Sequence, residues 1–211
     1  MNYEDTPFEI HVHGDVKIRP DVGFKTLQEA LQPLWKYAGA ASLADGAESL
    51  YEDEPGISFE VPNHTLHMCW TVRGGEDFRA QLDDLCMNLN EVSAEGAPIE
   101  VTFYDASFYE DDDDDEDEAD EEREARDDFV LLFVGPTPAA IMQAQRNLLV
   151  EDLVALMARH FEEGELGGVV AEVDRLFEGR YSALAHSLDL GRPPQRGGGG
   201  GGSRYTPRRL H

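Results

Sequence analysis

Apolar and polar residues alternate strictly over residues 8–18, which is the period of a β-strand with one face toward a core and one toward water. The same two-residue period returns in three further stretches, residues 57–61, 66–72 and 99–104. Pro62 and Asn63 separate the middle two stretches in the way that turn residues separate the arms of a hairpin. The pattern therefore predicts four half-buried strands.

Two helices are predicted between these strands, because apolar residues recur there at helical spacing over residues 24–38 and 76–94. Pro33 lies inside the first pattern and predicts a kink or a restart of the helix. The resulting order, strand–helix–strand–strand–helix–strand, is typical of a ferredoxin-like split βαβ sandwich. Right-handed crossovers would place the first and third strands side by side in the centre of the sheet.

The C-terminal third predicts one more strand and a helical pair. Residues 129–134 are apolar on both faces, which indicates a covered strand that extends the sheet beside the fourth strand. Thr137 and Pro138 form a helix start, and the helix from Ala139 to about residue 160 is apolar nearly all round. We expect that helix to be buried on more than one side, and a second amphipathic stripe to follow over residues 166–188. The predicted fold class is α+β.

Charge is distributed unevenly along the 211 residues, which carry 44 acidic and 17 basic side chains and a net charge of −27. Residues 110–128 hold 15 of the acids and two arginines, whereas residues 191–211 hold five arginines and no acid. Self-repulsion in the first segment and a six-glycine run in the second oppose folding. We therefore expect a single domain over residues 1–190 with a disordered acidic loop at 107–127, followed by a disordered Gly/Arg-rich tail at 191–211.

Composition excludes several classes of protein. Two cysteines are too few for a disulfide-stapled secreted fold, and no apolar stretch reaches the length of about 18 residues that a membrane span needs. The acidic start of the chain is unlike a signal peptide. The net charge argues against binding of nucleic acid or anionic lipid by the folded surface. We expect a cytoplasmic protein whose partner has a basic surface, with the oligomeric state left open.

One constellation of side chains has chemical potential. His11 and His13 lie on the polar side of the first predicted strand, and His67 and Cys69 on the polar side of the third. If those strands are neighbours, the four could hold a transition-metal ion, with Glu9 and Glu100 as supporting carboxylates, or a thiolate–imidazole pair could act as nucleophile and base. The simpler interpretation is four hydrogen-bonded sheet residues. No catalytic, cofactor-binding or metal-ligating residue and no cofactor is assigned, and Cys86 is expected to be a buried thiol.

Three stretches resemble an uncharacterised bacterial family of acidic proteins. They are residues 25–40, residues 66–72 and residues 129–136. The resemblance would cover residues 8–194 and leave the glycine tail outside. It implies no activity, site or substrate.

The sequence leaves three functions open. The leading hypothesis is a non-enzymatic protein-interaction module with an acidic docking loop. The first alternative is a small-molecule or metal-binding module that uses the His/Cys face of the sheet, with or without enzymatic activity. The second alternative is an acidic nucleic-acid mimic that occupies the binding cleft of a basic protein.

Overall fold

A computed structural model describes residues 8–106 and 127–188 and shows an α+β fold with a five-stranded antiparallel sheet. The strands are β1 (Phe8–Lys17), β2 (Gly56–Glu60), β3 (Thr65–Gly74), β4 (Ala97–Asp105) and β5 (Asp128–Val134). The helices are α1 (Phe24–Ala30), α2 (Gln32–Tyr37), α3 (Leu43–Gly46), α4 (Phe78–Val92), α6 (Pro138–Met157) and α7 (Glu163–Leu188). The fold class predicted from the sequence is confirmed.

The strand order is β2-β3-β1-β4-β5, so β1 and β3 are neighbours in the centre of the sheet as predicted. The fifth strand pairs with β4, which is also as predicted. The ferredoxin-like assignment itself stays a prediction. The predicted acidic loop and Gly/Arg-rich tail lie outside the described residues, apart from Asp127.

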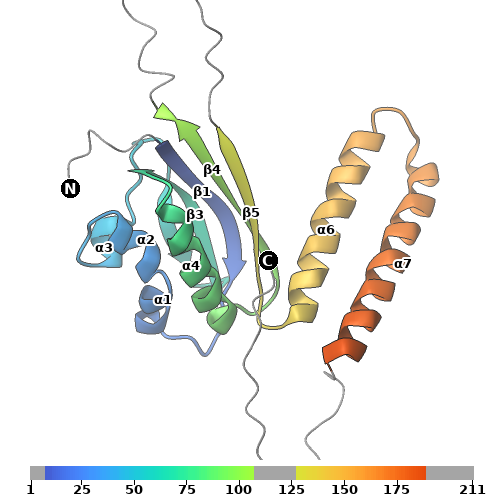
Figure 1. The fold of residues 1–211 in the computed structure, drawn as a ribbon, viewed down its shortest axis with the longest axis horizontal. Coiled ribbons are helices and arrows are strands. Elements are labelled where there is room, and N and C mark those ends of the chain that lie inside the picture. Colours follow the sequence, from blue (N-terminus) through green and yellow to red (C-terminus); the bar gives the residue numbers. More distant parts are fainter. Residues whose placement is uncertain (1–7, 107–126, 189–211) are drawn as a thin grey trace, which may run out of the picture.

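The core lies on one face of the sheet, under α1, α2 and α4 (Figure 1). Ile10, Val12 and Val16 of β1 are completely buried there, because every second side chain of a strand points to the same face. Leu85 and Leu89 of α4 meet them from the helix layer. Each fully buried aliphatic side chain stabilises the fold by about 1.5–3 kcal/mol relative to an exposed one. The apolar residues at every second position of β1 therefore determine which face of the sheet the helices cover.

The predicted interruption at Pro33 is confirmed. Helix α1 ends at Ala30, Leu31 separates the two helices, and α2 restarts at Gln32 with Pro33 in its first turn. A proline fits there because the first amides of a helix have no acceptor within the helix. The restart lets Leu34 and Trp35 turn into the same core that Leu27 and Leu31 enter.

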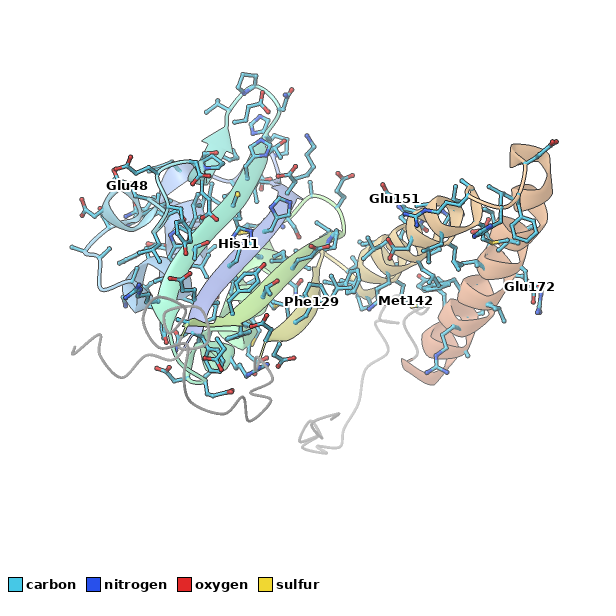
Figure 2. All side chains as sticks on the ribbon, turned by 90° about the horizontal axis from the view of Figure 1, so that it is seen from above. His11, Glu48, Phe129, Met142, Glu151 and Glu172 are labelled. Atoms are coloured by element: carbon cyan, nitrogen blue, oxygen red, sulfur yellow. The ribbon has the colours of Figure 1, made fainter. Side chains whose placement is uncertain are left out.

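The prediction of a covered fifth strand is wrong. Strand β5 lies at the edge of the sheet, and Phe129 on its open face is 54% exposed. Leu131 on the same face is also exposed. The reason is that the C-terminal helices extend beyond the β5 edge and do not lie over the open face, as both views show (Figures 1 and 2).

Helices α6 and α7 form an antiparallel hairpin that extends beyond this edge (Figure 1). Thr137 caps α6 by accepting a hydrogen bond from the amide of Ala140 at 3.1 Å, and Pro138 follows it, as predicted. The prediction that α6 is buried on more than one side is wrong, because Ala144 is its only fully buried residue. A pattern that is apolar all round marks a helix that needs neighbours, and α7 supplies one of them.

The hairpin is anchored to the sheet by a close backbone approach at Gly96, just before β4. A Cβ atom at this position would lie 2.0 Å from the carbonyl oxygen of Ala140 and 3.0 Å from the Cβ of Ala144. Only glycine leaves room for α6 to begin there. On the other side, the amide of Gly135 donates a hydrogen bond to the side-chain oxygen of Asn90 on α4 at 2.7 Å.

We predict that Gly96→Ala destabilises the protein by about 1–3 kcal/mol, because the backbone of α6 must move to admit the methyl group. Gly168→Ala is the matched control, since a Cβ at this helical position of α7 has no neighbour within 4 Å. The control should be neutral or should stabilise by up to about 1 kcal/mol. Urea unfolding of both variants measures the difference, and equal midpoints would contradict the proposed anchor.

Candidate metal centre

The open face of the sheet carries the polar residues of β1 and β3. In the β1–β3 register, His13 lies opposite Cys69 and His11 lies opposite Thr71. These residues alternate with Ile10, Val12 and Trp70, which point into the core. The α6–α7 hairpin lies away from His11 (Figure 2), so the C-terminal helices do not separate these side chains.

Three potential metal ligands converge on this face. His11, His13 and Cys69 each offer a ligand atom, and the three atoms lie within 4.8 Å of one another. The two imidazole rings stack, with 6.1 Å between their centroids and 14° between their planes. Within the described part of the chain, no other group of three or more His, Cys, Asp or Glu residues converges in this way.

A hydrogen-bond network fixes the orientation of His11. Its Nδ1 lies 2.9 Å from the hydroxyl of Thr71 and 3.3 Å from a carboxylate oxygen of Glu54. The Thr71 hydroxyl, which is buried, donates to the same carboxylate oxygen at 3.0 Å. With the hydroxyl proton directed to Glu54, the Thr71 oxygen accepts from Nδ1–H of His11. This tautomer leaves Nε2 of His11 with a free lone pair.

The fourth residue of the predicted constellation, His67, does not join the others. Its Nδ1 lies 2.8 Å from a carboxylate oxygen of Asp15, and its Nε2 lies 3.5 Å from one of Glu60. The physical reason is the register, which pairs His67 with Asp15 and so places it two residues along the strand from the pair His13–Cys69. A shift of two residues keeps the side chain on the same face but separates it from the cluster.

The two carboxylates proposed as supports have different surroundings. Glu9 accepts a hydrogen bond from the Tyr51 hydroxyl and lies 3.6 Å from the guanidinium of Arg73. The hydrogen bond to Glu9, helped by burial, raises the pKa of Tyr51 to about 12. Glu9 is therefore engaged away from the cluster. Glu100 of β4 lies directly opposite His13, where its charge can act on that side chain.

The environment of Cys69 does not support a thiolate nucleophile. Burial raises the pKa of the Cys69 thiol, and the negative charges of Glu54 and Asp53 raise it further. Reactive cysteines need the opposite environment, with positive charge that lowers the thiol pKa. The other thiol, Cys86 of α4, is half-buried against the core, where burial raises its pKa to about 11.

A hollow of about 600 Å³ adjoins the cluster. Its walls include His11, Glu54, Thr71, Glu9, Tyr51 and Tyr104. Carboxylates and phenols dominate this lining, so the hollow suits a cation or a donor of hydrogen bonds.

Glu54 and Tyr51 are site residues that no sequence pattern predicted. Both belong to the stretch between α3 and β2, whose small and acidic composition predicts a loop or short helix and carries no motif. Only the fold brings this stretch beside β3, where the amide of Leu50 donates to the carbonyl oxygen of Thr71 at 2.9 Å.

We predict that Thr71→Val costs about 1–3 kcal/mol of folding stability, because His11 and Glu54 both lose a partner in a partly buried place. Thr102→Val on β4 is the matched control, since Thr102 faces the same side of the sheet opposite His11. The control should change stability by less than about 0.5 kcal/mol. Thermal unfolding compares the two, and a similar loss in both would argue against the network.

None of the helices in residues 8–106 and 127–188 combines the length and the hydropathy needed to cross a membrane. Neither the curated proteins nor the solved structures contain a match to this chain. A family model does match residues 8–178, which span the sheet, the candidate site and most of the helical hairpin. The chain therefore belongs to DUF6806, a family of unknown function.

Proposed function

We propose that this protein is a non-enzymatic protein-interaction module that assembles with a second copy through its α6–α7 hairpin and offers its acidic surface to a basic partner. The observation that carries this proposal is the exposure of large apolar side chains along both helices of the hairpin. Leu156 of α6 is 62% exposed and Leu176 of α7 is 57% exposed, and Leu149 lies one heptad before Leu156 on the same face.

The α6–α7 hairpin buries too little apolar surface to account for the stability of its two helices. Among its described side chains only Ala144, Leu166 and Val173 are buried, and each keeps 6–8% of its surface exposed. One layer of contact between the helices, at Val150, Val154 and their neighbours, is well packed. Helices owe most of their stability in water to the packing of an apolar face, so the outer leucines favour a further partner.

The space between the two helices supports the same inference. Near the body, α6 and α7 leave an open hollow of about 600 Å³, bordered by Met142, Phe177 and Tyr181 and by the ion pair of Arg146 with Asp174. This open groove leaves apolar side chains of both helices in contact with water, and removing such surface from water is favourable. Side chains of a second hairpin would fill it.

The low charge of the first part of α6 is compatible with a second copy at this surface. The first 13 residues of α6 contain a single charged side chain, Arg146, although the whole chain has a net charge of −27. Two copies repel each other least where the acids are fewest. A helix of 20 residues is about 30 Å long, and two such helices side by side offer roughly 600 Å² to a partner. A symmetric dimer would thus bury roughly 1,200 Å², the lower limit of specific interfaces.

The acidic remainder of the surface supports the second half of the proposal. Residues 110–128 alone contribute a net charge of −13, and clustered charge of one sign speeds encounter with an oppositely charged protein. Such an association should weaken as added salt shortens the screening length below about 8 Å.

We predict that the wild-type chain sediments as a dimer, with a mass near twice 23.5 kDa, and that Leu149→Glu with Leu156→Glu converts it to a monomer. Each buried leucine is worth about 1.5–3 kcal/mol, or roughly tenfold to hundredfold in the dissociation constant. Both copies lose these contacts in a symmetric dimer. Sedimentation equilibrium over a wide range of protein concentrations measures the change.

Met87→Glu is the matched control, since Met87 on α4 is 68% exposed but belongs to the body of the fold. This variant should remain dimeric. A milder pair, Leu149→Gln with Leu156→Gln, guards against misfolding of the charged variant, and slow amide exchange in β1 verifies that the sheet is intact. A wild-type chain that stays monomeric at every concentration would refute assembly through the hairpin.

A further inference from the structure

From the convergence of their side chains we infer that His11, His13 and Cys69 bind one transition-metal ion, with zinc as the best match, on the open face of the sheet. Two imidazole nitrogens and one sulfur are the ligand types that zinc prefers. The three come from adjacent central strands whose backbones are held in register by the β1–β3 ladder. The site therefore rests on two paired strands in the interior of the sheet.

The observed spacing is close to that of a bound site. Ligands at 2.0–2.3 Å from a tetrahedral zinc ion are about 3.3–3.8 Å apart, whereas the three ligand atoms here lie within 4.8 Å of one another. The difference is about 1 Å, which side-chain rotation covers without any movement of the strands. His13 is exposed and free to make most of this adjustment, and Cys69 faces it directly across the ladder.

The surroundings of His11 match those of a metal-bound histidine. Such a histidine usually donates its second ring N–H to a carboxylate, which fixes the ring and strengthens the ligand nitrogen. Here Thr71 and Glu54 hold Nδ1 of His11, so Nε2 is the nitrogen left to bind the ion. Glu54 is thereby a positioning residue, not a ligand.

Charge also favours a cation at this place. Cys69 would bind as the thiolate after releasing its proton to solvent, which supplies one negative charge. Glu54, Asp53 and Glu100 add carboxylates beside the cluster. Three protein ligands leave the fourth tetrahedral position of zinc for a water molecule. Of the three ligands, His11 also borders the neighbouring hollow, together with Glu54.

This inference is independent of the assembly proposed above, because the hairpin supplies none of the ligands. Zinc can bind to a monomer, and the hairpin can dimerise without zinc. The metal measurements below report on sulfur and nitrogen ligation, whereas sedimentation reports on mass, so the failure of either leaves the other intact.

The test uses the full chain without an affinity tag, titrated with Co²⁺ as a spectroscopic substitute for zinc and then with Zn²⁺ in competition. We expect one ion per chain, a thiolate-to-cobalt charge-transfer band and the strong visible absorption of tetrahedral cobalt. Cys69→Ser should abolish the charge-transfer band, and His13→Ala should weaken binding by at least about a hundredfold. Glu54→Gln should weaken it by about tenfold to hundredfold, as the loss of an orienting carboxylate does.

The chain provides two matched controls. Cys86→Ser removes the other thiol, which lies on α4, and His67→Ala removes a histidine on the same face that is engaged by Asp15 and Glu60. Both should bind cobalt as the wild type does. The inference is overturned if the wild-type chain shows no charge-transfer band, or if His67→Ala weakens binding as much as His13→Ala. Diffuse binding by exposed carboxylates would appear as several weak sites without sulfur ligation and would also overturn it.

Discussion

Strand β1 pairs along both of its edges, with β3 on one side and β4 on the other. The alternation of apolar and polar residues in β1 therefore determines which face of the whole sheet is buried. The even-numbered residues Ile10, Val12 and Val16 draw the helices to one face, and the odd-numbered residues His11 and His13 remain on the other. A slip of one residue in either ladder would expose the core and bury the histidines, so the hydrophobic free energy that holds the core also fixes the polar cluster.

The periodicity of the sequence was sufficient to predict the first four strands, because alternation of apolar and polar residues shows directly which face of a strand is buried. The order of the strands followed from the rules of chain connection, and Pro33 located the helix restart. The position of His67 relative to the cluster could not be predicted, because a shift of two residues leaves a side chain on the same face of the sheet. Only the actual β1–β3 register separates His67 from the pair His13–Cys69. The role of Glu54 could not be predicted for another reason. A loop residue acquires its partners only when the chain is folded.

The errors at β5 and α6 have a common cause. A pattern of apolar residues indicates that a strand or helix packs against a partner. It does not indicate whether that partner belongs to the same chain. The sequence predicts more burial of β5 and α6 than is observed among the described residues. Phe129, Leu149 and Leu156 remain exposed. The disagreement between sequence and structure is thus concentrated in the C-terminal third, which is where an assembly surface is proposed.

The connection between β4 and β5 runs from residue 106 to residue 127, in contrast to the short turn that joins β2 to β3. The entropic cost of closing a chain segment grows only with the logarithm of the number of residues in it, so doubling the length of a connection costs about 0.6 kcal/mol. The β4–β5 ladder of seven residue pairs therefore forms at little additional entropic cost despite the length of the connection.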